Sequence, residues 1–185
     1  MWWLWWFGCA GGEPVATPSS RVDAVAAPQV TPQQLEAFCD QRATAETARP
    51  FPLPATTPPL APASTWRWIN LWATWCGPCV AEMPTLARWE KRLATEAVPA
   101  DLVFVSVDRT DAEVSRFLDK HPGLPHDVRL DPYDQLPAWF EALGVAPDTA
   151  IPLHVFVDPD GRVRCVRAGA INPADYPLVK ALISG

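Results

Sequence analysis

The sequence has little histidine and only one pair of closely spaced cysteines. Its three histidines, His121, His126 and His154, are spread along the chain and do not gather with the cysteines. A structural zinc site needs four ligands, which usually come from two such cysteine pairs. We therefore expect no metal site, and the sequence points to no other cofactor.

Basic charge is also scarce. The 185 residues include 15 Lys and Arg against 21 Asp and Glu, which gives a net charge of −6 and a pI of about 5.0. Because nucleic-acid binding requires a basic face, we expect no nucleic-acid partner. The length is enough for one domain plus extra segments, and 49% hydrophobic residues permit a sizeable core.

A long hydrophobic run is missing at the N-terminus, although four of the ten tryptophans lie within the first six residues. The apolar run from Trp2 to Phe7 is too short to span a bilayer. We interpret residues 1–12 as the end of a truncated export signal whose true start lies upstream. Cys9 resembles a bacterial lipoprotein processing site, which predicts lipidation and a membrane tether. The alternative is a frayed aromatic terminus with an incidental thiol.

Proline is plentiful, with 22 residues, and is dense between residues 49 and 62. Residues 13–62 are therefore predicted to form an extended, Pro-rich linker with a short helix near residues 31–42. From residue 63 onward, apolar strands alternate with helical patterns. Residues 63–185 are predicted to form one folded domain.

The pattern of this domain predicts an α/β architecture. Strands are predicted at residues 67–73, 101–107, 153–157 and 162–167, and helices at residues 79–96, 111–120, 138–143 and 175–184. Asp108, Thr110 and Asp111 are plausible caps for the second helix. The turn at residues 158–161 joins the last two strands as an antiparallel hairpin. The expected fold is a mixed central β-sheet with helices on both faces.

The stretch Cys76-Gly77-Pro78-Cys79 lies between the first predicted strand and the first predicted helix. Residues three apart share one helical face, so the two sulfurs can bond. Free N–H groups at a helix N-terminus stabilise the thiolate of Cys76, and Pro78 fits the first turn. A purely structural disulfide would close too small a loop to stabilise the chain much. The pair therefore indicates thiol–disulfide redox chemistry.

Several segments together resemble the thioredoxin superfamily, and within it the exported TlpA/ResA/DsbE-like thiol–disulfide oxidoreductases. Residues 70–79 resemble the strand and redox turn of that branch, and Glu82-Met83-Pro84 matches its Glu-x-Pro. Residues 151–161 resemble its cis-proline strand and final hairpin, and Gly169 fits the glycine that ends the hairpin. The resemblance implies a thioredoxin-like three-layer fold for residues 63–185.

The resemblance also implies individual roles. Cys76 would be the attacking nucleophile and Cys79 the resolving cysteine. Glu82 would be the acid–base group, because Asn70 replaces the buried Asp of thioredoxin. The residues expected to shape the active site are Trp75, Gly77, Pro78, Asn70, Ile151 and Pro152. Of these, Pro152 would be cis beside the disulfide, and Ile151 would offer backbone groups to an extended partner.

Each of these roles has a simpler alternative. Glu82 could merely favour the first turn of a helix, Trp75 could be a packing residue, and Pro152 could be trans. Leu153 and His154 replace the small or Thr residues usual after the cis-proline. We interpret His154, which alternates with Leu153 along a strand, as structural rather than catalytic.

Two further cysteines have no place in the redox turn. Cys39 lies in the predicted short helix and Cys165 in the last strand. Some members of the exported branch carry a comparable disulfide, so we expect a Cys39–Cys165 bond that ties the helix to the sheet edge. Two unrelated buried thiols are the alternative. A structural disulfide implies an oxidising compartment, which agrees with a periplasmic or cell-envelope location.

Taken together, these patterns predict an enzyme that reduces protein disulfides outside the cytoplasm. It is expected to be a monomer that takes electrons from a membrane thiol donor. Its Gly-Pro dipeptide is that of thioredoxin, whose reduction potential is about −270 mV, against about −120 mV for the oxidant DsbA. Apocytochrome haem-site thiols, a copper-site protein and general disulfides all stay open as substrates.

Two other functions compete with this interpretation. A partner-binding or assembly module without turnover would not need an intact dithiol. A peroxiredoxin-like peroxidase typically uses a Thr-x-x-Cys nucleophile, and Thr74 and Cys76 have the wrong spacing for it.

Overall fold

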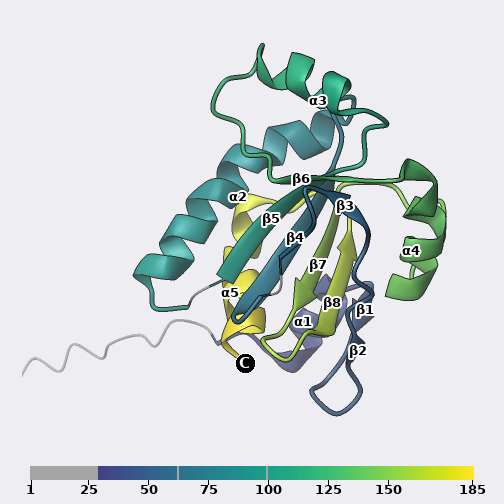
Figure 1. Ribbon diagram of the computed structural model, residues 1–185. Helices are drawn as coiled ribbons and strands as arrows, with labels where there is room; N and C mark the ends of the chain where they lie inside the picture. The colour runs from purple at the N-terminus through teal and green to yellow at the C-terminus, as the bar shows by residue number, and fades with distance from the viewer. Residues whose placement is uncertain (1–28, 62, 99) are drawn as a thin grey trace, which may run out of the picture.

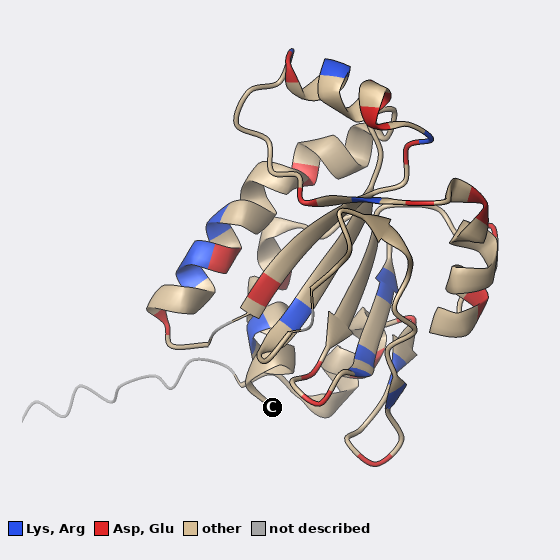
Figure 2. Cartoon of the chain, viewed as in Figure 1, with Lys and Arg blue, Asp and Glu red and all other residues tan. Residues whose placement is uncertain are grey.

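The structure is a computed structural model that describes residues 29–61, 63–98 and 100–185. The expected export segment with Cys9 lies outside these residues, as does the first part of the predicted linker. Within the described ranges, no helix is both long and apolar enough to cross a membrane. Acidic and basic residues are interspersed along the visible elements of the described chain (Figure 2).

Four long strands form the centre of the sheet, and all four were predicted. They are β4 (Trp66–Trp72), β5 (Ala100–Ser106), β7 (Leu153–Val157) and β8 (Arg162–Ala168). The strand β4 lies between β5, to which it is parallel, and β7, to which it is antiparallel. Because β4 and β7 are buried on both faces, their sequences are nearly continuous apolar runs rather than alternating ones.

Helices cover both faces of this sheet (Figure 1). The predicted helices are present as α1 (Pro32–Phe38), α2 (Gly77–Thr95), α3 (Asp111–Leu118), α4 (Leu136–Leu143) and α5 (Tyr176–Ser184). Short 3-10 turns, η1 (Tyr133–Gln135) and η2 (Pro173–Asp175), lead into the last two. On one face, the ring of Trp89 from α2 meets Tyr176 of α5 at 5.1 Å, and Trp68 of β4 stacks on Phe156 of β7 at 5.2 Å. The α/β, three-layer prediction is confirmed.

The Pro-rich stretch is not a linker throughout, and the prediction differs from the structure there. Three two-residue strands from it extend the sheet: β1 (Gln41–Arg42) and β2 (Arg49–Pro50) pair with β8, and β3 (Thr56–Thr57) pairs with β6 (Val128–Leu130). Strands this short present no two-residue periodicity, so the sequence pattern did not reveal them. The strands β1 and β2 lie at one edge of the sheet and β3 lies at the other. Edge strands tolerate proline, because the missing N–H can face solvent there.

A disulfide joins the first helix to the last strand. Cys39, which caps the C-terminus of α1, bonds Cys165 of β8, with the two Cα atoms 5.5 Å apart. Both residues are buried, and the ring of Phe38 lies 6.4 Å from that of Phe156 in the core. The pairing is the one that the resemblance implied, and it fixes α1 against the sheet.

Removing this disulfide should destabilise the fold without touching the redox turn. It spans 126 residues of sequence, and loss of a native disulfide from a small domain costs about 2–5 kcal/mol. We expect Cys39→Ala/Cys165→Ala to lower the free energy of unfolding by that amount in denaturant titrations. Cys76→Ala/Cys79→Ala, which opens only a four-residue loop, serves as the control. An unchanged denaturation midpoint for Cys39→Ala/Cys165→Ala would contradict a stabilising role.

Candidate active site

The redox turn stands at the N-terminus of α2, directly after β4. Cys76 is the N-cap residue, and its sulfur accepts a hydrogen bond from the backbone N–H of Cys79 at 3.3 Å. The two cysteines form a disulfide with Cα atoms 5.3 Å apart. Cys76 keeps 5% of its surface exposed, whereas Cys79 is fully buried. One sulfur therefore stands at the surface side of the turn, and the other is covered by protein.

Gly77 and Pro78, between the cysteines, form the exposed first turn of the helix. Proline is tolerated there because its missing N–H has no intrahelical partner in any case. A Cβ built on Gly77 would meet no heavy atom within 4 Å. Glycine is therefore not required at this position by packing.

The loop before β7 faces the redox turn. The Ile151–Pro152 peptide bond is cis, and the carbonyl oxygen of Ile151 lies 3.7 Å from the sulfur of Cys76. Pro152 is buried and Ile151 is partly exposed. The structure thus brings these two sequence-predicted residues against Cys76, in the arrangement that the resemblance implied.

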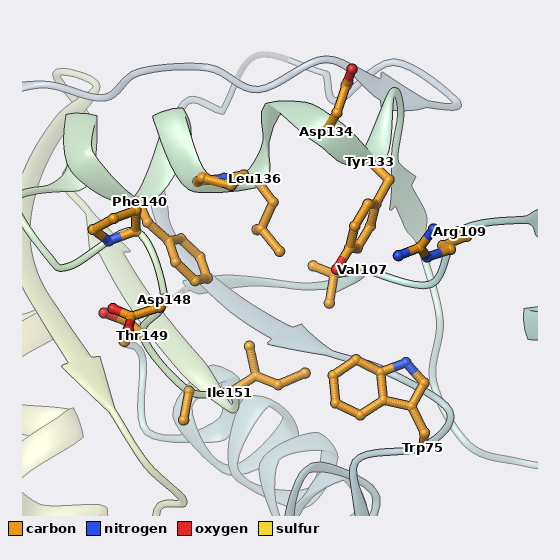
Figure 3. A pocket seen from close by; sticks show the side chains of 13 residues that line it. Trp75, Val107, Arg109, Tyr133, Asp134, Leu136, Phe140, Asp148, Thr149 and Ile151 are labelled. Atoms are coloured by element: carbon orange, nitrogen blue, oxygen red, sulfur yellow. The ribbon is translucent and has the colours of Figure 1, made fainter.

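A cavity of about 680 Å³ opens beside the turn (Figure 3). Trp75 and Ile151 lie along one side of it, and Leu136 and Phe140 project into it from α4 on the other. Trp75 leaves 68% of its surface exposed, so it is not a core packing residue. Sequence patterns gave no sign of the cavity, because its walls come from four separate segments of the chain.

Asp108 ties the redox turn to the end of β5. Its carboxylate accepts hydrogen bonds from the backbone N–H of Thr74 at 3.0 Å, the hydroxyl of Thr74 at 2.8 Å and the hydroxyl of Ser106 at 2.7 Å. The sequence interpretation took Asp108 as one of several caps for the helix that begins at Asp111. The structure confirms Thr110, which is the N-cap of α3 and forms a capping box with Glu113, and corrects Asp108, whose carboxylate binds the redox turn instead.

Beneath the turn, three buried polar side chains meet. The amide nitrogen of Asn70, on β4, donates to Glu82 Oε1 at 2.8 Å, and the backbone N–H of Ile171 donates to Glu82 Oε2 at 2.8 Å. His154 Nε2, from β7, lies 3.3 Å from Glu82 Oε1. Asn70 and His154 are fully buried and Glu82 is 5% exposed. Glu82 is therefore not a solvent-exposed residue that merely favours the first helical turn.

Glu82 lies about one helical turn from Cys79 on α2. It follows Cys79 by three residues on α2, so both side chains share one face of the helix. His154 was missed as part of this site. Its place beside Asn70 follows from the antiparallel pairing of β4 and β7, in which these two residues are direct cross-strand partners, and no local sequence signal reveals that pairing.

In the described part of the chain, no three His, Cys, Asp or Glu side chains gather as a metal site. The groups at the turn are instead a disulfide, hydrogen-bond donors at a helix N-terminus and a buried carboxyl group. This set can exchange electrons through sulfur and move a proton.

The mixed sheet flanked by helices, the Cys-x-x-Cys disulfide at a helix N-terminus and the cis-proline facing it define a protein of the thioredoxin-like class. The chain belongs to the Redoxin family, which it matches over residues 67–182.

Several named proteins are similar to the chain. The thiol-disulfide oxidoreductase ResA of Oceanobacillus iheyensis is 31% identical over 107 residues, which are 56% of this chain and 50% of that protein. ResA of Bacillus subtilis is 30% identical over 104 residues, or 56% and 53% of the two chains. The chain therefore spans about half the length of the curated relatives it matches. A solved thiol:disulfide interchange protein of the thioredoxin family from Chlorobium tepidum has a TM-score of 0.54 at 26% identity, covering 74% of this chain and 98% of that one.

Proposed function

We propose that the protein is a thiol–disulfide oxidoreductase that reduces disulfides in other proteins through Cys76 and Cys79. The observation that carries this proposal is the Cys76–Cys79 disulfide at the N-terminus of α2, with the Ile151 carbonyl 3.7 Å from the Cys76 sulfur. The similarity to ResA proteins supports it.

The first half-reaction starts from the reduced dithiol. The Cys76 thiolate attacks one sulfur of the substrate disulfide, whose S–S bond breaks as the bond to Cys76 forms. The second substrate sulfur leaves as a thiolate and takes up a proton. The N–H groups at the start of α2 stabilise the attacking thiolate.

The second half-reaction releases the substrate. Glu82 accepts the proton of the Cys79 thiol, and the resulting thiolate attacks the Cys76 sulfur of the mixed disulfide. The substrate sulfur that was bonded to Cys76 leaves as a thiolate and takes up a proton from solvent, and the Cys76–Cys79 disulfide forms. Two electrons have then passed from the dithiol to the substrate, so an external dithiol must reduce the pair again. We assign that task to a membrane thiol donor.

The proposed setting is the periplasm or cell envelope, with the protein acting as a monomer. The structural disulfide between Cys39 and Cys165 supports an oxidising compartment. Lipidation of Cys9 and a tether through the N-terminal segment complete this proposal, and mass spectrometry of the mature N-terminus tests them.

The two cysteines should behave differently when each is replaced. Cys76→Ser should abolish reduction of a protein disulfide, because the attacking sulfur is gone. Cys79→Ser should stop the reaction at a stable mixed disulfide, which non-reducing gel electrophoresis and mass spectrometry detect. Cys39→Ala/Cys165→Ala is the control and should retain turnover. Full turnover by Cys79→Ser would contradict the assigned roles, and a Cys79→Ser protein that captures no disulfide substrate would favour a binding module.

The reduction potential of the Cys76–Cys79 pair tests the direction of electron flow. Gly77 and Pro78 form the dipeptide of thioredoxin, so equilibration with glutathione should give a Cys76–Cys79 reduction potential of about −270 mV. A value near −120 mV, as in DsbA, would overturn the reductant proposal while leaving thiol–disulfide exchange intact.

A further inference from the structure

We infer that Asp108 is a positioning residue for the redox turn and that the negative charge of its buried carboxylate makes the Cys76–Cys79 pair a stronger reductant. This inference rests on the proposed function and adds a residue that biases the direction of electron flow. Asp108 follows β5 by two residues and is 2% exposed. The two proposed half-reactions make no use of it.

Asp108 extends the contact between β4 and β5 beyond the ends of both strands. At the end of β4, the carbonyl of Trp72 accepts a hydrogen bond from the backbone N–H of Val107 at 2.8 Å. Just past this bond, the backbone N–H of Thr74 donates to the Asp108 carboxylate, at 3.0 Å to Oδ2 and 3.3 Å to Oδ1. The carboxylate thus provides the acceptor that a strand carbonyl provides inside the sheet.

Thr74 belongs to the tight turn that leads to Cys76. The backbone N–H of Cys76 donates to the Ala73 carbonyl at 3.0 Å, which closes a turn over Thr74 and Trp75. Because Asp108 binds both the N–H and the hydroxyl of Thr74, it fixes one of the two central residues of this turn. The placement of Cys76 at the end of β4 therefore depends on Asp108.

The hydrogen bonds of Asp108 are those of an ionised carboxyl group. Both oxygens accept, Oδ1 from the Thr74 hydroxyl at 2.8 Å and Oδ2 from the Ser106 hydroxyl at 2.7 Å. The Ser106 oxygen accepts the backbone N–H of Asp108 at 3.0 Å, which leaves its own proton for the carboxylate. Within the described chain, Asp108 forms no ion pair. Hydrogen bonds alone hold this negative charge beside the redox turn.

The neighbouring basic groups leave the charge of Asp108 uncancelled. Burial lowers the pKa of His126, an effect that the carboxylates of Asp108, Asp111 and Asp127 oppose only in part, so the imidazole is neutral at pH 7. Arg109 follows Asp108 in the chain, but its guanidinium lies over the aromatic ring of η1, at 5.0 Å.

The uncancelled charge acts on the reduced form of the pair. The N-terminus of α2 stabilises the Cys76 thiolate, and a nearby carboxylate opposes this effect. Thr74 and Cys76 are two residues apart, a span of at most about 7 Å, so the carboxylate lies within roughly 10 Å of the Cys76 backbone. At an effective dielectric constant of about 20, a unit charge at that distance changes the thiolate equilibrium by about tenfold.

A less stable thiolate makes the dithiol a stronger reductant. DsbA illustrates the converse, because it is a strong oxidant through the stability of its reduced form. In the equilibrium with glutathione, the dithiol passes two electrons to glutathione disulfide, the Cys76–Cys79 bond forms, and two glutathione thiols are released. The charge of Asp108 drives this reaction towards the Cys76–Cys79 disulfide.

The test equilibrates the full chain with mixtures of reduced and oxidised glutathione. Asp108→Asn removes the charge and keeps the size of the side chain. We expect it to shift the equilibrium constant about tenfold towards the dithiol, which is a rise of about 30 mV in reduction potential. Thr74→Val removes one hydroxyl donor but keeps the charge, and should retain most of the native value. Asp160→Asn makes the same change of net charge at an exposed residue and should leave the potential unchanged.

The alkylation of Cys76 by iodoacetamide across a range of pH gives a second readout. Asp108→Asn should move the midpoint of the rate profile about one pH unit towards acid pH, because the thiolate no longer faces a carboxylate. A residue that only packs against the turn would leave this midpoint in place. Urea denaturation shows whether each variant is folded. If Asp108→Asn is unfolded, Asp108→Ser removes the same charge and is measured in its place.

A native equilibrium constant and a native alkylation midpoint in the folded variant would overturn the inference. Equal shifts in Asp108→Asn and Thr74→Val would also overturn it, because the geometry of the turn rather than the charge would then explain both. A native pair as oxidising as DsbA would instead overturn the reductant proposal, while the difference between the native protein and Asp108→Asn would still decide the role of Asp108.

Discussion

The register between β4 and β7 determines where the groups of the candidate site lie. Leu71 is paired with Leu153, and Asn70 with His154. The residues that follow β4 therefore meet the residues that precede β7, which sets the Cys76 sulfur beside the Ile151 carbonyl. A slip of one residue would turn Asn70 and His154 to opposite faces of the sheet, and Glu82 would lose one of its neighbours.

The same register divides the site into an exposed side and a buried side. On the exposed side, Trp75 and the cavity lie next to Cys76. On the buried side, Asn70 and His154 surround the carboxyl group of Glu82, three residues along α2 from Cys79. Under the proposed function, the exposed groups and the proton-transferring groups would thus lie on either side of one disulfide.

Local features of the site could be predicted from the sequence, and contacts between distant segments could not. The Cys76–Cys79 spacing, the long buried strands and the helix N-terminus each depend on residues within one short stretch of the chain. Asp108 illustrates the opposite case, because its contact with Thr74 depends on β4 and β5 lying side by side. The two-residue edge strands were missed since their pairing, rather than their own sequence, makes them strands.

The open space around Gly77 separates the chemistry of the turn from the stability of the fold. A side chain at this position would meet nothing, whereas the residues that build the turn, such as Asp108 and Cys79, are enclosed by contacts. At Gly77 a side chain can therefore be introduced with no repacking. Selection on the redox behaviour of the turn could therefore act at this exposed position without disturbing the packing of the fold.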